Sequence, residues 1–211
     1  MTIEEIVKRT DHIPSSVYPP EQEMWLKYLY DLPEGTKIVD FGTGWGKSAA
    51  SLSLACPHGF VVTFDKGDVY VMHKNVSDLG EYGLKVAGYF RDAGVENNVR
   101  HFYDADSLSP ETMKKVMEVV GKDEIDVLNV DSGHSYETTL EELKLWAPKV
   151  RIGGFISLHD WEHPKAPGVR EGWDAYMAQG DIKVEFLGLA GCPDEFTVPP
   201  LVTMALFRRI E

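Results

Sequence analysis

Two acidic residues and a histidine stand where two apolar strands are expected to end. Asp131 follows the run IDVLNV, Asp160 follows GGFISLH, and His134 lies three residues beyond Asp131. The carboxyl ends of parallel strands meet at one edge of a sheet, so both carboxylates should emerge together. Such a pair could hold Mg²⁺ or another hard cation against a substrate hydroxyl, and His134 is placed to accept the hydroxyl proton.

Each of these residues also has a purely structural interpretation. Asp131 could cap the helix expected after Ser135, and His134 could be a hydrogen-bonded histidine at a turn. We interpret His134 as a catalytic base in preference to that alternative, and we expect His159 to orient Asp160. Whether a metal is bound stays open at this point.

A glycine-rich turn at Ile38–Ser48, IVDFGTGWGKS, joins an expected strand to an expected helix. Alternate glycines allow a sharp turn and a close approach to a ligand, and the unpaired N–H groups of the following helix can receive an anion. A dinucleotide loop would read GxGxxG, and a phosphate-binding P-loop would need glycine where Phe41 stands. Neither fits, so we expect a different nucleotide-like cofactor here, contacted by Asp40, Gly42, Thr43, Gly44, Trp45 and Gly46.

Further acids follow the next strands. Asp65 ends FVVTFD, where a carboxylate can bond both hydroxyls of a ribose. Asp106, after the third strand, could accept from an adenine amino group or could equally be a turn or cap residue. We also place Asp131 beside the cofactor.

The elements that must position these residues alternate along the chain. Short apolar runs separated by helical stretches predict an α/β fold, a doubly wound sheet with helices on both faces. We expect seven strands, mostly parallel, at Lys37–Phe41, Phe60–Asp65, Val99–Tyr103, Ile125–Asp131, Gly154–His159, Lys183–Leu187 and Leu201–Arg208, the last two paired antiparallel. Helices are expected at Pro20–Leu32, Gly46–Ala55, Gly80–Ala93, Pro110–Val120, Tyr136–Ala147 and Gly168–Gln179. The stretch Lys66–Leu79 could be a loop over a ligand.

Composition favours one domain, 1–211, with a core at 35–211 and a helical cap or dimer segment at 1–34. The 211 residues carry a formal charge of −13, which disfavours nucleic acid and membrane surfaces as partners. A homodimer is possible. Two distant cysteines, an acidic N-terminus and the lack of a long apolar run predict a cytoplasmic protein.

With these residues in place, the chain resembles class I S-adenosylmethionine-dependent methyltransferases from about Ile38 to Arg208. DFGTGWG matches their first motif, and Asp65 matches their second acidic position. The segment NVDSGHSYETTLEELKLWAPKVRIGGFISLHDW is similar to small-molecule O-methyltransferases of the macrocin and mycinamicin group. A Rossmann-like fold and S-adenosylmethionine as cofactor are what this resemblance implies.

The resemblance also implies roles for the acids and the histidine. Asp131 and Asp160 match metal ligands, and His134 matches the proposed base in methylation of a sugar, alcohol or phenol hydroxyl. One departure is that His159 and Trp161 flank Asp160, where metal-dependent relatives carry a second acid or amide, which puts Mg²⁺ in doubt. The alternatives are a metal-free methyltransferase acting on nitrogen and a non-catalytic S-adenosylmethionine-binding module.

Overall fold

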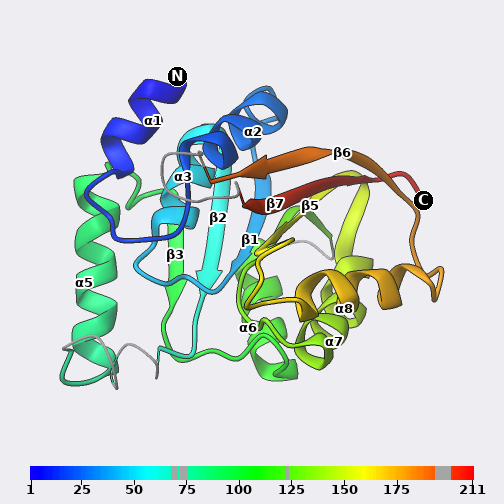
Figure 1. Cartoon of the computed structure of the whole chain (residues 1–211). Helices are drawn as coiled ribbons and strands as arrows, with labels where there is room; N and C mark the ends of the chain where they lie inside the picture. The colour runs from blue at the N-terminus through cyan, green and yellow to red at the C-terminus, as the bar shows by residue number, and fades with distance from the viewer. Residues whose placement is uncertain (68–70, 72–75, 122–123, 193–200) are drawn as a thin grey trace.

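A mixed sheet forms the centre of the molecule (Figure 1). The computed structural model describes residues 1–67, 71, 76–121, 124–192 and 201–211. Seven strands lie in the order β3-β2-β1-β4-β5-β7-β6. Their bounds are β1 Thr36–Phe41, β2 Gly59–Phe64, β3 Val99–Phe102, β4 Ile125–Val130, β5 Val150–His159, β6 Val184–Gly191 and β7 Val202–Arg209. The first five strands run parallel, and β7 pairs antiparallel with both β5 and β6.

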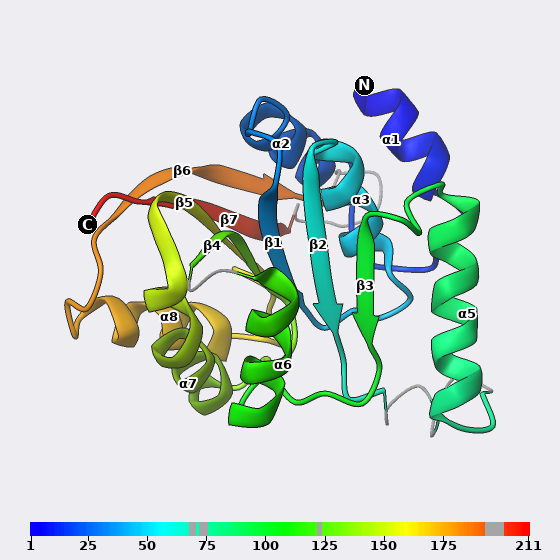
Figure 2. The same cartoon turned by 180° about the vertical axis from the view of Figure 1, so that it is seen from behind.

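Helices cover both faces of the sheet (Figures 1 and 2). One face carries α1 Ile3–Thr10, α2 Pro19–Leu29, α3 Lys47–Ala55 and α5 Leu79–Asp92. The other carries α6 Pro110–Val120, α7 Tyr136–Trp146 and α8 Gly168–Met177, with the short 3-10 helix Ala147–Lys149 after α7. No helix in these described ranges is both long and apolar enough to cross a membrane.

The strand sequences explain why two cores form. Consecutive residues of a strand point to opposite faces, so Ile38 packs under α3 and α5 while its neighbour Val39 packs under α6 and α7. In β4, Val127 and Leu128 divide in the same way. Strands buried on both faces read as continuous apolar runs, which is the pattern that the sequence showed.

The predicted elements are confirmed, with differences at their ends. Helix α2 stops at Leu29 rather than Leu32, and β6 continues to Gly191, beyond the predicted Leu187. Strand β5 begins at Val150, four residues before the predicted Gly154, and includes Gly153 at a positive φ of 81°. Half of the predicted loop 66–79, residues 68–70 and 72–75, lies outside the described residues.

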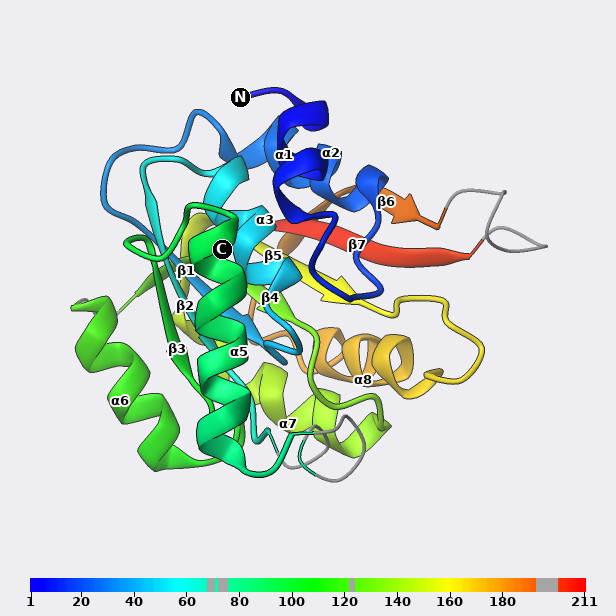
Figure 3. The ribbon, with the colours of Figure 1, turned by 90° about the vertical axis from the view of Figure 1, so that its left-hand side faces the viewer.

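The strand order places a ligand site. The chain proceeds from β1 outward to β3, then returns to β4 on the other side of β1, so the loops after β1 and β4 diverge. A crevice forms at such a switch point, at the carboxyl ends of the strands. In Figure 3 the chain between α1 and α2 passes beside α3 toward the carboxyl end of β5. There Gln22 donates hydrogen bonds to Thr10 at 2.9 Å and Ser51 at 2.7 Å, joining α2 to α1 and α3.

Candidate active site

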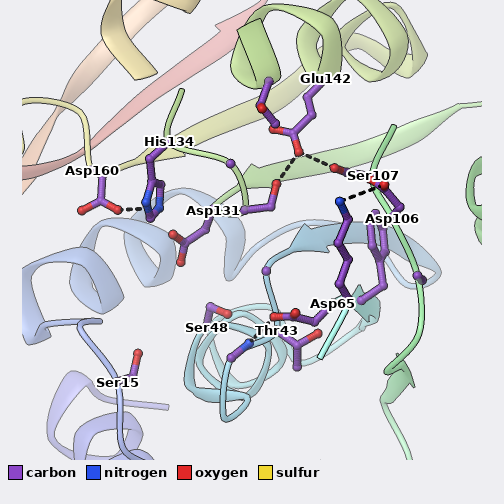
Figure 4. A pocket seen from close by; sticks show the side chains of 18 of the residues that line it. Ser15, Thr43, Ser48, Asp65, Asp106, Ser107, Asp131, His134, Glu142 and Asp160 are labelled. Atoms are coloured by element: carbon purple, nitrogen blue, oxygen red, sulfur yellow. Dashed lines mark hydrogen bonds and ion pairs between the residues drawn. The ribbon is translucent and has the colours of Figure 1, made fainter. Parts of the chain in front are cut away.

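A cavity of about 810 Å³ opens at this switch point (Figure 4). Its wall is made by the loops after β1 to β5, by the start of α7 and by Pro14–Ser16 of the N-terminal segment. Most of the residues predicted from the sequence line it: Gly42, Thr43, Gly44, Trp45, Asp65, Asp106, Asp131, His134 and Asp160. Residues that lie far apart in the chain thus meet around one space.

The glycine turn adopts the backbone that its sequence indicated. Gly42, Gly44 and Gly46 have positive φ values of 74°, 55° and 97°. At Gly42 a Cβ atom would lie 1.8 Å from the main-chain oxygen of Asp131, because the chain after β4 passes directly against Gly42 before the two loops separate. Glycine is therefore required at this position both by its backbone angle and by the lack of space.

Asp40 and Gly46 support the cavity and are not among the residues that line it, so the prediction that they contact the cofactor stays a prediction. Asp40 is fully buried. It accepts hydrogen bonds from Ser48 at 3.0 Å, Thr63 at 2.7 Å and Asn129 at 2.7 Å. Burial raises the pKa of Asp40 to about 7 against the effect of these donors. Gly46 caps α3, and a Cβ there would meet the Phe90 ring at 2.6 Å.

Asp65 stands at the middle of the cavity with both oxygens fixed. Its Oδ2 accepts from the Gly44 N–H at 3.1 Å, and its Oδ1 accepts from the Gly67 N–H at 2.8 Å. A carboxylate can accept about four hydrogen bonds through its two oxygens. This arrangement suits two vicinal hydroxyls.

Asp106 lies at one end of the cavity and stabilises a turn there. Its Oδ1 accepts from the Leu108 N–H at 3.0 Å, which stabilises the turn, and its Oδ2 pairs with Lys66 at 2.9 Å. Burial acts to raise the pKa of Asp106, but the Lys66 and Leu108 contacts lower it overall. The carboxylate also faces the cavity, so the turn interpretation does not exclude a ligand contact.

The opposite end holds the paired acids and the histidine. His134 Nε2 lies 3.0 Å from Asp160 Oδ2. The hydrogen bond that His134 donates to Asp160 raises the pKa of His134 despite partial burial. Burial acts to raise the pKa of Asp160, but its contacts with the His134 and His159 rings hold it well below its usual value. Asp160 has φ of 55°, the one positive value recorded for a non-glycine residue in the described ranges. Backbone strain of this kind is concentrated at functional sites.

His159 links this end of the cavity to helix α2. It is 2% exposed, and its Nδ1 lies 3.3 Å from Asp131 Oδ1 and 3.5 Å from Asp160 Oδ2. Its Nε2 lies 3.2 Å from Glu21 Oε1 on α2. Burial opposes a charge on this ring, but Asp131 and Glu21 raise its pKa well above the usual value. The expected orienting role of His159 fits this position, because its ring contacts both acids.

Asp131 does not cap α7, which excludes the structural alternative considered for it. Ser135 is the N-cap and accepts from the Thr138 N–H at 3.1 Å. Asp131 instead faces the cavity, and burial raises its pKa while His159 opposes that shift.

A methyltransferase-domain family model matches residues 39–161, more than half of the chain, and this match includes both ends of the cavity. The chain belongs to this family. It is a class I S-adenosylmethionine-dependent methyltransferase. No curated protein matches the chain.

Solved structures support the same fold for this methyltransferase. An O-methyltransferase from Bacillus cereus in complex with SAH is 14% identical, with a TM-score of 0.65, over 99% of this chain and 90% of that one. The O-methyltransferase TomG from Streptomyces achromogenes in complex with SAM is 16% identical, with a TM-score of 0.62, over 99% and 88%. The O-methyltransferase NovP is 18% identical, with a TM-score of 0.65, over 98% and 88%.

Sequence reasoning missed two buried acids of the methyltransferase. Glu21 on α2 contacts His159, at the end of the cavity that holds His134 and Asp160. Glu142 on α7 lines the cavity near Ser107 and Ser132. Glu21 also accepts from the Tyr18 N–H at 2.7 Å, so in sequence it resembles an ordinary first-turn cap residue. Only the tertiary structure reveals that both carboxylates point inward.

Proposed function

We propose that the enzyme transfers a methyl group to a hydroxyl of a small molecule, with His134 as the general base. The observation that carries this proposal is the 3.0 Å pair between His134 Nε2 and Asp160 Oδ2 on the cavity wall. The His134 side chain is 49% exposed, so a substrate can reach it. O-methyltransferases among the solved structures of the same fold add support.

The proposed cofactor pose follows the chemistry of the wall. Asp65 accepts from the ribose hydroxyls, and Asp106 marks the adenine end. The main-chain N–H groups of the glycine turn and of the first turn of α3 receive the methionine carboxylate. The sulfonium methyl group then faces Asp131, His134 and Asp160. Methyl transfer is an in-line displacement, so holding the acceptor oxygen against the methyl group supplies much of the rate.

Proton removal falls to His134 in this proposal. Because Nε2 faces Asp160, the neutral ring donates its Nε2 hydrogen to that carboxylate, and Nδ1 is the nitrogen that accepts a proton. Asp160 then stabilises the imidazolium that forms. His159 and Glu21 hold Asp160 from the side away from the cavity.

A divalent cation at Asp131 and Asp160 belongs to the same proposal. These carboxylates and His134 each offer a ligand atom, and the three atoms lie within 4.8 Å of one another. The donor set therefore fits such an ion, although Mg²⁺ prefers oxygen ligands and an imidazole favours softer metals. When bound, a cation would lower the pKa of the acceptor hydroxyl. One nitrogen of His134 cannot both bind a metal and accept the substrate proton. A test for metal dependence therefore also tests whether His134 is the base.

Replacement of His134 tests the base directly. With labelled S-adenosylmethionine and a panel of sugars, alcohols, phenols and amines, we expect methylation of hydroxyl compounds. H134A should lower kcat by about 10²-fold or more, while S-adenosylhomocysteine binds as in the wild type. H58A, at an exposed histidine, is the matched control. Full activity of H134A would remove His134 from the mechanism, and turnover of amines alone would favour a nitrogen acceptor.

Chelation tests the cation. Activity of the EDTA-treated, dialysed enzyme should fall and return with Mg²⁺ or Mn²⁺ if Asp131 and Asp160 hold a metal. D131N should then lose the response to added metal. Unchanged turnover after chelation would reject the cation and leave His134 as the sole proton acceptor. Cofactor binding without any methyl transfer across the whole panel would favour a binding module.

A further inference from the structure

Glu142 organises the end of the cavity opposite His134. Its side chain is fully buried on α7. Its Oε1 accepts hydrogen bonds from the hydroxyls of Ser107, in the loop after β3, and Ser132, in the loop after β4 (Figure 4). One turn later on α7, the Trp146 indole donates to the Ser107 main-chain oxygen at 2.8 Å. The helix therefore fixes two loops that carry cavity residues.

These contacts decide what the serines can offer a ligand. A serine hydroxyl has one hydrogen and two acceptor lone pairs. Because Ser107 and Ser132 both donate to Glu142, only their lone pairs remain for the cavity. A proton on Glu142 would not reverse this, since it would reside on Oε2, and Oε1 would still accept from both hydroxyls.

The rest of this end has the same polarity. Asp106 is an acceptor, and Lys66 beside it, at the exposed rim, is paired with that carboxylate at 2.9 Å. Glu142 Oε2 is buried and makes no hydrogen bond within the described part of the chain. The side chains of Ser107, Ser132 and Glu142, which form the cavity floor, thus present hydrogen-bond acceptors. Such a floor is complementary to a ligand with N–H donors.

We propose that Glu142 is a positioning residue that makes this floor select a 6-amino purine over a 6-oxo purine. The inference rests on the proposed cofactor pose, with the adenine at the Asp106 end. An exocyclic amino group supplies two donors to the serine oxygens and Asp106. A 6-oxo group would set an acceptor against acceptors and leave buried polar atoms unpaired, which strongly disfavours binding.

The variant E142L tests the proposal with little change in size. Leucine has no acceptor, so the hydroxyl hydrogens of Ser107 and Ser132 lose their partner and can turn toward the cavity. Binding of S-adenosylhomocysteine and of its 6-oxo analogue, S-inosylhomocysteine, is measured by calorimetry. The wild type should prefer the adenine compound, and E142L should lose about tenfold of that preference, mostly through weaker adenine binding.

The matched control is E141L, which makes the same change on the exposed face of α7, where Glu141 pairs with Lys144. Its preference should equal that of the wild type. An E142L protein with an unchanged ratio of the two affinities overturns the inference. If E142L does not fold, S132A and S107A give the decision: loss of preference in either supports the inference, and an unchanged ratio in both overturns it. Failure of the wild type to bind S-adenosylhomocysteine would instead overturn the proposed function.

Discussion

A continuous series of polar contacts runs from helix α2 to the proposed base. It connects Glu21, His159, Asp160 and His134 in that order. Glu21 is fully buried and also accepts from the Thr203 hydroxyl on β7. A buried carboxylate with this many partners is costly to alter, because removing one partner leaves the others unpaired. A change at Glu21 should therefore affect the methyl-transfer rate through the His159 ring, which contacts Asp160.

The variant E21Q should therefore lower kcat by about tenfold and the free energy of unfolding by about 1–3 kcal/mol. The glutamine keeps the size of the side chain but removes the charge that faces His159 Nε2. Turnover and calorimetric unfolding measure the two effects, and E23Q, at an exposed acid of the same helix, is the control. S-adenosylhomocysteine affinity should stay constant, and a kcat equal to that of the wild type would disconnect Glu21 from the chemistry.

The sequence predicted the residues at strand ends better than those on helices. Asp131 and Asp160 follow apolar strands, and parallel topology brings such positions to one edge. Glu21 and Glu142 lie on helices among other polar residues, where an inward carboxylate has the same local pattern as a solvated one. Which side of each helix faces the cavity depends on packing between distant elements, so local patterns could not find them.

At the scale of elements, α7 and α8 hold the loop that carries His134. Gly168 begins α8 so close to this loop that a Cβ would lie 2.3 Å from the Tyr136 nitrogen and 2.7 Å from the His134 main-chain oxygen. The contact involves backbone atoms, which cannot rotate away. Glycine is needed here for close approach, since no positive φ is recorded for Gly168.

The variant G168A should consequently shift the His134 loop. We expect a loss of about 1–3 kcal/mol in unfolding free energy, the usual cost of overpacking, and a lower kcat. G88A is the control, because a Cβ on Gly88 of α5 meets only the end of Arg91 at 3.8 Å. Alanine there should leave activity unchanged and add up to about 1 kcal/mol of stability. Equal stability of the two variants would show that the helices can separate without cost.

Element prediction succeeded where apolar runs were bounded by turns and was less accurate at the C-terminal edge. Strand β6 was predicted to end at Leu187 but continues through Gly188 and Gly191, with register shifts against β7. Glycines weaken the local preference for a strand, and pairing with β7 overrides it. Helix α1, absent from the predicted elements, is short and forms with a capping box at Thr2 and Glu5.

At the scale of the whole molecule, the N-terminal segment belongs to the site. Pro14–Ser16 lines the cavity, and α1 and α2 pack into the same core as α3 and α5. The Arg9 guanidinium donates to the Ala93 and Gly94 main-chain oxygens at the end of α5. The segment therefore borders the cavity within one chain, and the prediction of a helical cap or dimer segment at 1–34 stays a prediction.

The pH dependence of stability should report the buried charge under the glycine turn. The pKa of Asp40 is about 7 in the fold against 3.8 for a free carboxyl, because the side chain is buried. Between these values the folded state binds a proton that the unfolded state has released. The contribution of Asp40 to the unfolding free energy must then fall as pH rises from about 4 to about 7. Above about pH 7 this contribution stays constant.

The variant D40N removes this titration. The unfolding free energy of both proteins is compared at pH 5 and pH 8. The fall between these pH values should be smaller in D40N than in the wild type, and the two falls should differ by on the order of 2 kcal/mol. At any single pH, D40N also carries the cost of a mismatched amide beside Asn129, so only the difference between pH values is diagnostic. Denaturant unfolding at both pH values measures that difference.

D92N is the control, because it removes one acidic group at an exposed site and should follow the wild-type curve. It separates the burial of Asp40 from the general repulsion within a chain of charge −13. Parallel curves for D40N and the wild type would mean that Asp40 is ionised throughout and that its three hydrogen-bond donors outweigh its burial.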